Sequence, residues 1–483
     1  MSKEIRVRIA PSPTGNLHIG TARTALFNWL FAKHKKGTFV LRIEDTDLER
    51  SDPKYEKDIL DGLKWLGLEW DEFYKQSERM DIYEKYIQKL LNDGKAFWCY
   101  HTKEELEQEQ KEQMANKLAP RHICDHKYKI PQNKEGGIIR LNVDEKSDEK
   151  IKFNDIIRGE IEFEEKLLGD LSIAKNEKTP LYNFAVVVDD HETKISHVIR
   201  GEDHIPNTPK QILIGKALGF HNPSNPLGQV MPEYAHLPLI LGSDKSKMSK
   251  RHGATSITEY NEEGYLPEAM FNYMAFLGWT PKDSEKEIMD KDEIIKNFDL
   301  KNVHKSGAVF NLDKLNWINS QYIKNLSDEE LITKILVLSS RYQVLSNKEN
   351  TIKKILPMIK ERMEKLSDIK EFLFFFKDPE YEKDLLMWKK YETIDIQKTL
   401  EMVKELVTEI GVGAPDTLRE KLDDLASKLK TDPDAKPDRG LVYWPFRVSL
   451  SGQKGSPDPV DIAVVLGQEE VIKRINKAIQ KLK

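Results

Sequence analysis

The strongest constraint on the fold lies near the N-terminus, where a strand pattern, a Pro/Gly-rich loop and a helix pattern follow one another. Residues 5–9 alternate apolar and polar side chains as a strand does, and prolines and glycines then interrupt residues 11–20. From Ala22 onward apolar residues recur at helical spacing, and "TFVLRI" (38–43) is again strand-like. This order predicts a βαβ unit, and hence the start of a parallel sheet.

In the rest of the chain, the pattern of apolar and polar residues changes twice. Residues 97–180 combine a polar helix with alternating strands, which we interpret as an insertion between two halves of the sheet. Thr208 and Pro209 are expected to be the N-cap and first residue of a further helix. After residue 320 the pattern is almost wholly helical. Between residues 180 and 320, strand-like patterns return at 183–191, 195–204 and 236–242.

Composition excludes several classes of protein. The 483 residues contain no apolar run of about 18 residues that could span a membrane, and residues 1–10 lack the apolar core of a secretory signal. Two cysteines cannot form a disulfide framework, so a reducing cytoplasm is expected. The 76 basic and 81 acidic residues give a net charge of −5, which argues against indiscriminate coating of nucleic acid but permits local basic patches.

Two loops carry residues suited to phosphate chemistry. The helix that follows His18 offers unpaired backbone N–H groups to a phosphate, and Gly20 allows a close approach. The second loop, "GSDKSKMSKRHG" (242–253), holds Lys247 and Lys250, which can stabilise the charge on a departing pyrophosphate. Taken singly, the first loop could equally be a tight turn with a solvated histidine, and the second a solvated run of charge.

Taken together, the two loops resemble the HIGH and KMSKS signatures of class I aminoacyl-tRNA synthetases. Longer stretches, including "RIAPSPTGNLHIGTARTALFNWLFA", "LRIEDTD", "HVIRGEDHIPNTPKQILI" and "KMSKRHGATSI", resemble the bacterial-type glutamyl-tRNA synthetases from residue 5 to about 320, and more loosely beyond. The last signature positions are Thr21 and Arg251, as is usual in the glutamyl branch. The resemblance implies an α/β fold, with a Rossmann-like parallel sheet, an inserted α+β subdomain and an all-α anticodon-binding half.

The resemblance also implies a reaction. Glutamate and ATP, with Mg²⁺, would form glutamyl-adenylate, and glutamate would then pass to the 3′-terminal adenosine of tRNA-Glu with release of AMP. A monomer is the family default, and whether tRNA-Gln is also charged stays open. The two expected halves of the catalytic domain are residues 1–96 and 181–255. An acceptor-end-binding insertion is expected at 97–180, a stem-contact connector at 256–320 and an anticodon-binding region at 321–483.

Five residues match the family's glutamate site. A fixed cation is what separates a carboxylate from the nearly isosteric amide of glutamine, and we assign Arg200 mainly to the γ-carboxylate. Glu44 matches the acceptor of the α-amino group. Some relatives carry an Asn in this pocket where this chain has Val186, so that contact is not expected here. The full expected set is Arg8, Ser12, Glu44, Tyr182 and Arg200.

A second set of residues matches the family's ATP site. At the start of the helix, His18 and Gly20 would contact the nucleotide or its phosphates, and Asp203 would flank the nucleotide. Lys250, with Lys247, would hold phosphates in the transition state. No general base is needed, because the substrate's α-carboxylate is already a nucleophile and positioning can carry the step. The expected catalytic residues are therefore His18, Gly20, Lys247 and Lys250.

Both cysteines of the chain lie in short Cys-x-His pairs. Twenty-two residues separate the pair Cys99 and His101 from the pair Cys124 and His126, and such donors suit tetrahedral Zn²⁺. Some glutamyl-tRNA synthetases carry a C-x-C…C-x-H zinc site here, with a second Cys where this chain has His101. His122 is a competing ligand. The alternative is two unrelated buried thiols beside exposed histidines.

Contacts with tRNA must be local, given the negative net charge. Candidate phosphate contacts are Lys305, Lys314, Lys324 and the Lys-rich helices after residue 330. Arg362 is a candidate reader of the third anticodon base by resemblance. Three alternatives share parts of the pattern. Arg200 and the helical C-terminal half argue against a glutaminyl-tRNA synthetase. The length argues against a truncated relative that glutamylates a tRNA base. The intact His18, Gly20, Lys247 and Lys250 argue against a non-catalytic paralogue.

Overall fold

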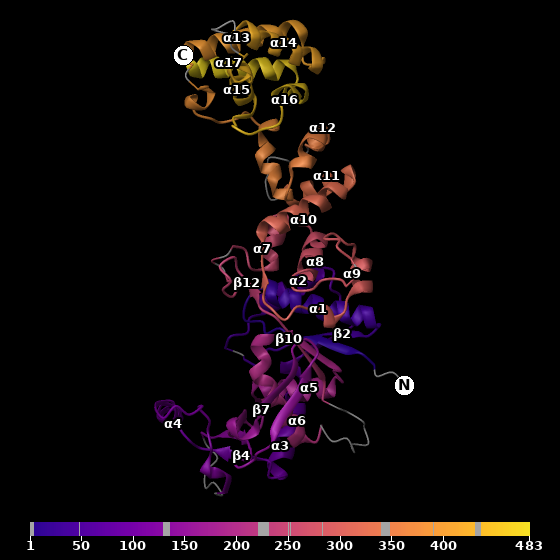
Figure 1. Cartoon of the computed structure of the whole chain (residues 1–483), viewed down its shortest axis with the longest axis vertical. Coiled ribbons are helices and arrows are strands. Elements are labelled where there is room, and N and C mark those ends of the chain that lie inside the picture. The colour runs from indigo at the N-terminus through magenta and orange to yellow at the C-terminus, as the bar shows by residue number, and fades with distance from the viewer. Residues whose placement is uncertain are drawn as a thin grey trace. The chain divides into compact units, whose positions relative to one another are not determined.

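The computed structural model describes residues 4–47, 49–128, 136–220, 231–249, 251, 253–282, 284–339, 348–389, 391–429 and 436–483. The chain divides into two compact units. Unit 1 comprises residues 1–261 and 267–315, and unit 2 comprises residues 262–266 and 316–483. Figure 1 shows the α/β character of the first and the helical character of the second. Among the described residues, no helix is both long enough and apolar enough to cross a membrane.

A seven-stranded sheet is the frame of unit 1. Its order is β3-β2-β1-β10-β11-β6-β7, and every neighbouring pair is parallel except β6 with β7. The two central strands are buried runs, as expected for a parallel sheet covered on both faces. The strands span β1 Arg6–Ile9, β2 Thr38–Ile43, β3 Glu72–Lys75, β6 Lys150–Asp155, β7 Gly159–Glu164, β10 His197–Gly201 and β11 Glu233–Leu237.

Helices cover both faces of this sheet (Figure 1). Helix α1 packs on β1, β2 and β10 from one side, with α8 and α9 behind it. On the other face of the sheet, helices α3, α5 and α6 form a buried apolar cluster with the strands. The helices of unit 1 span α1 Ile19–Lys35, α2 Pro53–Trp65, α3 Met80–Asn92, α4 Lys103–Ala115, α5 Tyr182–Glu192, α6 Thr208–Leu218, α7 Ile257–Glu262, α8 Pro267–Ala275 and α9 Lys291–Asn297.

The stretch predicted as an insertion contributes to two sheets. A separate four-stranded sheet has the order β4-β5-β8-β9, with all pairs antiparallel. The β6–β7 hairpin instead extends the main sheet, because Asp155 pairs with Tyr234 of β11. The remaining strands of unit 1 span β4 Ala96–Cys99, β5 Ile138–Leu141, β8 Leu171–Asn176, β9 Thr179–Pro180, β12 Ile240–Leu241 and β13 Ala308–Val309.

Two local predictions were wrong. Residues 183–191 form helix α5 instead of a strand, because this segment is buried almost throughout and a continuous apolar run has no period that separates helix from strand. Thr208 is not the N-cap of α6, a position that belongs to Asn207. The Thr208 hydroxyl instead accepts a hydrogen bond from Arg200 at 2.7 Å.

The two signature loops lie side by side in unit 1. His18 and Ser256 form an antiparallel bridge, although 238 residues separate them in the chain. The Ile19 N–H donates to the Thr255 carbonyl at 2.9 Å, and the Ile257 N–H donates to the Leu17 carbonyl at the same distance. The fold therefore joins the start of α1 to the segment that follows the lysine-rich loop.

Unit 2 is built from helices. Its apolar core comes from amphipathic helices, among which α13, α15 and α17 pack most extensively together. Helix α10 begins in unit 1 and continues into unit 2. The helices span α10 Leu312–Asn325, α11 Asp328–Ser339, α12 Glu349–Ile359, α13 Thr393–Ile410, α14 Pro415–Lys428, α15 Arg439–Ser451, α16 Pro459–Leu466 and α17 Gln468–Leu482, with 3₁₀ turns at η8 Lys360–Arg362, η9 Leu366–Phe375 and η10 Lys383–Leu386.

Candidate active site

A cavity of about 470 Å³ opens where β1, β2 and β10 end, beside the start of α1. The carboxyl ends of parallel strands are the usual place for a ligand in an open α/β sheet. Lys250 lies outside the described residues. The other predicted substrate residues all line this one cavity: Arg8, Ser12, His18, Gly20, Glu44, Tyr182, Arg200, Asp203 and Lys247.

His18 is the N-cap of α1. Its Nδ1 accepts a hydrogen bond from the Gly20 N–H at 3.1 Å, so the neutral ring carries its proton on Nε2 and can donate it to a ligand. Burial, helped by the positive charge of Lys247, lowers the pKa of His18. The imidazole is therefore neutral at neutral pH and, with the N–H groups of the helix start, suits a phosphate oxygen.

The lysine-rich loop folds back on β12. Its Met248 N–H donates to the Ile240 carbonyl at 3.0 Å, and Lys247 forms a bridge with Leu241. The exposed Lys247 ammonium lies 3.8 Å from the carboxylate of Asp203. The loop therefore brings one exposed cation to the rim of the cavity.

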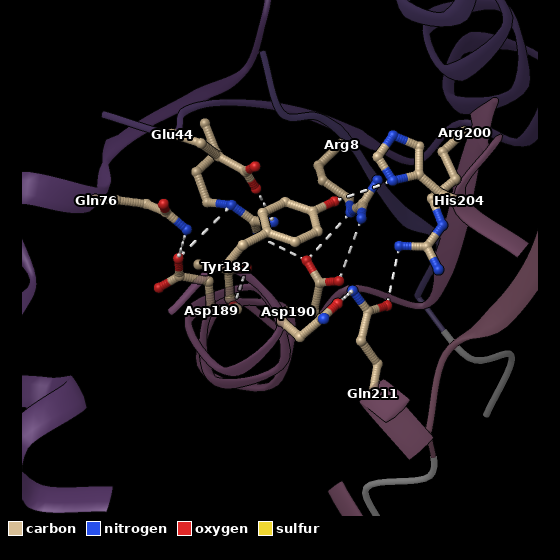
Figure 2. Close-up of polar contacts among 12 residues, drawn as sticks. Arg8, Glu44, Gln76, Tyr182, Asp189, Asp190, Arg200, His204 and Gln211 are labelled. Carbon is tan, nitrogen blue, oxygen red and sulfur yellow. Dashed lines mark hydrogen bonds and ion pairs between the residues drawn. The ribbon is translucent and has the colours of Figure 1, made fainter. Parts of the chain in front are cut away.

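Acidic side chains neutralise two of the arginines near the cavity. Arg8 Nε lies 3.1 Å from Asp190 Oδ1 (Figure 2). Arg42 Nη1 lies 2.6 Å from the same oxygen. Arg42 Nη2 also donates to Glu44 Oε1 at 3.0 Å. Burial raises the pKa of Glu44 in spite of the two arginines. A ligand ammonium group would therefore stabilise the charged form of this carboxylate.

Arg200 has a different environment. Arg200 is 5% exposed, and its guanidinium donates to Gln211 Oε1 at 2.9 Å, to Thr208 Oγ1 at 2.7 Å and to His236 Nε2 at 3.3 Å. In the part of the chain that the structure describes, no carboxylate forms an ion pair with it, and burial lowers its pKa. A buried cation without an anionic partner is costly, so this site favours an anionic ligand.

Two predicted residues border this region. The Tyr182 hydroxyl lies 3.3 Å from His204 Nδ1, and partial burial together with the Glu44 carboxylate raises the pKa of Tyr182 to about 12. Tyr182 therefore stays protonated. Ser12 is exposed and lines the cavity, whereas Val186 is buried away from it.

Several residues near the cavity were not identified from the sequence. Asp190 and Arg42 pair the sheet with α5, and Gln211 and His236 hold Arg200. The only signal in the sequence for these residues is the pair of adjacent acids in "VVDDH". A charged pair inside an apolar run needs buried partners, and this pair therefore indicates buried cations nearby.

The four Cys/His donors gather away from this cavity. The ligand atoms of Cys99, His101, Cys124 and His126 lie within 4.8 Å of one another. His101 Nδ1 is 3.5 Å from the Cys99 sulfur and 3.6 Å from the Cys124 sulfur. A sulfur and a nitrogen that bind one tetrahedral Zn²⁺ are about 3.6 Å apart. The donor set therefore fits zinc.

His122 also approaches this cluster. Its Nε2 lies 3.5 Å from the Cys99 sulfur, and its Nδ1 is 2.6 Å from Glu109. Metal-binding histidines commonly have such a carboxylate partner. His126 Nδ1 instead accepts the Tyr100 N–H at 3.1 Å. His122 and His126 are thus the two candidates for the fourth ligand.

The residues proposed to contact tRNA lie on exposed surfaces. Lys305 is exposed, Lys314 pairs with Glu287, and Lys324 pairs with Glu361. Such ion pairs are weak and can be exchanged for phosphate contacts. Arg362 is exposed at the end of η8 in unit 2.

Comparisons with known proteins cover the whole chain. Residues 4–317 match the family model for class I tRNA synthetases (E and Q), catalytic domain, and residues 329–479 match an anticodon binding domain model. A glutamate–tRNA ligase of Aquifex aeolicus is 42% identical over the full length of both chains. A second, from Thermoanaerobacter pseudethanolicus, is 42% identical over 99% of this chain and 98% of its own.

Solved structures agree. A glutamate tRNA ligase from Elizabethkingia meningosepticum, in complex with its amino acid, has a TM-score of 0.81 and 35% identity, covering 99% of this chain and 100% of that one. The glutamate-tRNA synthetase from Elizabethkingia anophelis has a TM-score of 0.80 and 36% identity, with the same coverage. The chain therefore belongs to the glutamyl-tRNA synthetase family of class I tRNA synthetases.

Proposed function

We propose that this chain is a glutamate–tRNA ligase, which activates L-glutamate with ATP and transfers it to the 3′-terminal adenosine of tRNA-Glu. The observation that carries the proposal is the uncompensated guanidinium of Arg200 in the same cavity as the start of α1. One end of the cavity thus offers a carboxylate site and another offers a phosphate site, as formation of an aminoacyl-adenylate requires.

Glutamate would be held by three kinds of contact. Arg200 would take the γ-carboxylate, because it has no other anion, and Glu44 would accept from the α-ammonium group. Arg8 already shares Asp190, so it would add a weaker contact to the substrate. Tyr182 and Ser12 would supply hydroxyl groups at the cavity wall.

ATP would lie with its phosphates at the start of α1. His18 Nε2 would donate to a phosphate oxygen, Gly20 leaves room for the backbone to approach, and Asp203 would flank the nucleotide. A glutamate α-carboxylate oxygen would bond to the α-phosphorus as the bond to the bridging β-phosphate oxygen breaks. Lys247 and Lys250 would stabilise the departing pyrophosphate, and Mg²⁺ would accompany ATP.

The remaining parts would hold the tRNA and a structural metal. The segments 97–180, 256–320 and 321–483 would meet the acceptor end, the stem and the anticodon, respectively. Zinc would be held by Cys99 and Cys124 with two histidines, and it would cross-link the polypeptide near β4 without taking part in the chemistry. The monomeric state and the cytoplasmic location stay predictions.

Aminoacylation tests the proposal directly. Purified protein, ATP, Mg²⁺ and labelled glutamate should give glutamyl-tRNA with tRNA-Glu, and labelled glutamine should not be transferred. Pyrophosphate exchange should be measured with tRNA present. A protein that neither exchanges pyrophosphate nor charges tRNA-Glu would refute the proposal. Running tRNA-Gln in parallel decides whether one or both tRNAs are substrates.

A further inference from the structure

We propose that Gln211 is a specificity-determining positioning residue: its uncharged amide holds Arg200 without cancelling the charge that selects a side-chain carboxylate. The proposal rests on the glutamate–tRNA ligase function and identifies a residue that acts through Arg200. Figure 2 shows the Gln211 side chain, which comes from α6, reaching Arg200.

The orientation of the Gln211 amide is fixed from both ends. Gln211 is 2% exposed, its Oε1 accepts from Arg200 Nη1 at 2.9 Å, and its Nε2 donates to Asn183 Oδ1 at 3.1 Å. Asn183 lies on α5, so the chain Arg200–Gln211–Asn183 joins the sheet to two helices. The guanidinium is therefore held in place by a buried network.

The chemistry of this position is unusual for a buried arginine. A glutamate at 211 would have the same shape and would form a stronger, charge-assisted bond. It would also neutralise Arg200 and repel a substrate carboxylate. The bond from Gln211 is weaker than a charge-assisted bond, but it leaves the positive charge of Arg200 available to the ligand.

The other two partners of Arg200 also carry no negative charge. Thr208 is neutral, and His236 places its ring between Arg200 and the buried carboxylate of Asp155. His236 Nδ1 lies 2.6 Å from Asp155 Oδ2, and backbone N–H groups of Ile157, Arg158 and His236 also donate to this carboxylate. Asp155 is thus satisfied without touching Arg200. Asp190 is bound to Arg8 and Arg42 and acts on Arg200 only at a distance.

Two variants separate the charge from the hydrogen bond. Gln211→Glu keeps the shape and the bond to Arg200 but adds a negative charge, whereas Gln211→Met keeps the length but loses the bond. If charge is what matters, Q211E should raise the KM for glutamate by at least ~10-fold with a much smaller change in kcat and in the KM for ATP. Q211M should have the smaller effect and should keep its preference for glutamate over glutamine.

Matched controls and outcomes complete the test. Gln88→Glu adds the same charge on an exposed face of α3 and should behave as wild type. Thermal unfolding reports whether each variant folds. An unchanged KM in folded Q211E, or a Q211M protein that no longer prefers glutamate, overturns the inference while wild-type charging of tRNA-Glu leaves the proposed function intact. If Q211E does not fold, an unchanged KM for glutamate in folded Q211M overturns the inference, because removal of a bond that holds Arg200 must weaken glutamate binding. Failure of the wild type to charge tRNA-Glu removes both proposals.

Discussion

Arg200 is the single residue on which recognition of glutamate should depend most. Replacing it with alanine removes a buried guanidinium of the cavity whose side-chain partners are all uncharged. We expect Arg200→Ala to lower kcat/KM for glutamate by ~100-fold or more, and to lower the ratio of glutamate to glutamine use. Steady-state aminoacylation with both amino acids measures this.

The control for this variant is Arg6→Ala. Arg6 lies at the amino end of β1, pairs with Glu72 and does not line the cavity. It should keep the wild-type preference. An Arg200→Ala enzyme that still prefers glutamate to the wild-type degree would contradict the assigned role.

Asp190 is the residue whose loss should cost most stability. It is buried and accepts from both Arg8 and Arg42. Asp190→Asn leaves two buried guanidinium groups without their shared anion, and breaking such a pair costs about 3–5 kcal/mol of unfolding free energy. Denaturant unfolding should show this loss, whereas Asp61→Asn, at an exposed ion pair, should change it by less than about 1 kcal/mol. Equal effects would contradict the assignment.

At the scale of elements, local patterns predicted the frame well. Strand β2 has the bounds 38–43 that its sequence suggests, and helix α1 begins at Ile19, directly after His18, as expected. These features depend on nearby residues, namely apolar period, proline, glycine and cap chemistry. Local chemistry therefore located His18, Gly20 and Lys247, whereas the other predicted residues of the cavity came from the family resemblance, namely Arg8, Ser12, Glu44, Tyr182, Arg200 and Asp203.

The parts that were missed depend on contacts between distant elements. Asp190 meets Arg42 across 148 residues, and Gln211 meets Asn183 across 28. Whether Asp190 faces the sheet depends on α5 being a helix, which its continuous apolar run does not disclose. The environment of Arg200 could not be derived before the strand register placed Arg200 beside His236.

The lysine-rich loop should act on the chemical step. We expect Lys250→Ala, and to a lesser degree Lys247→Ala, to lower kcat by ~100-fold while the KM for glutamate changes little, because stabilising a charge that develops only in the transition state affects rate more than binding. Single-turnover adenylate formation measures the step. Lys245→Asn is the matched control, because its φ of 60° suits asparagine. A lysine variant that raises only the KM for glutamate would contradict this role.

The Cys/His cluster should hold one zinc ion for each chain. Metal analysis of protein purified without chelator should find it, and Cys124→Ala should lose it. His122→Ala and His126→Ala decide the fourth ligand, since only the ligating residue should lower zinc affinity by more than ~10-fold. His304→Ala, outside the cluster, should keep the metal. A wild-type protein without zinc ends this assignment.

At the scale of the whole molecule, the amino-acid cavity and the match to an anticodon binding domain lie in different units. The cavity and its charges are formed within unit 1, and the anticodon binding domain match at 329–479 lies within unit 2. The chain carries a net charge of −5, so attraction to tRNA must come from local cations on its surface. A substitution that removes a tRNA contact in unit 2 should therefore raise the KM for tRNA without affecting the KM for glutamate or ATP.

Arg362 provides the sharpest test of this separation. It is exposed in unit 2, and a side chain that reads a base contributes about 1–3 kcal/mol of discrimination. We expect Arg362→Ala to raise the KM for tRNA-Glu by ~10-fold and to reduce the preference for the natural third anticodon base in tRNA transcripts. Arg439→Ala removes an exposed arginine of the same unit that pairs with Asp423, and should leave both quantities unchanged. If Arg362→Ala weakens all transcripts equally, Arg362 contacts phosphate and not the base, because only a base contact can distinguish one anticodon from another.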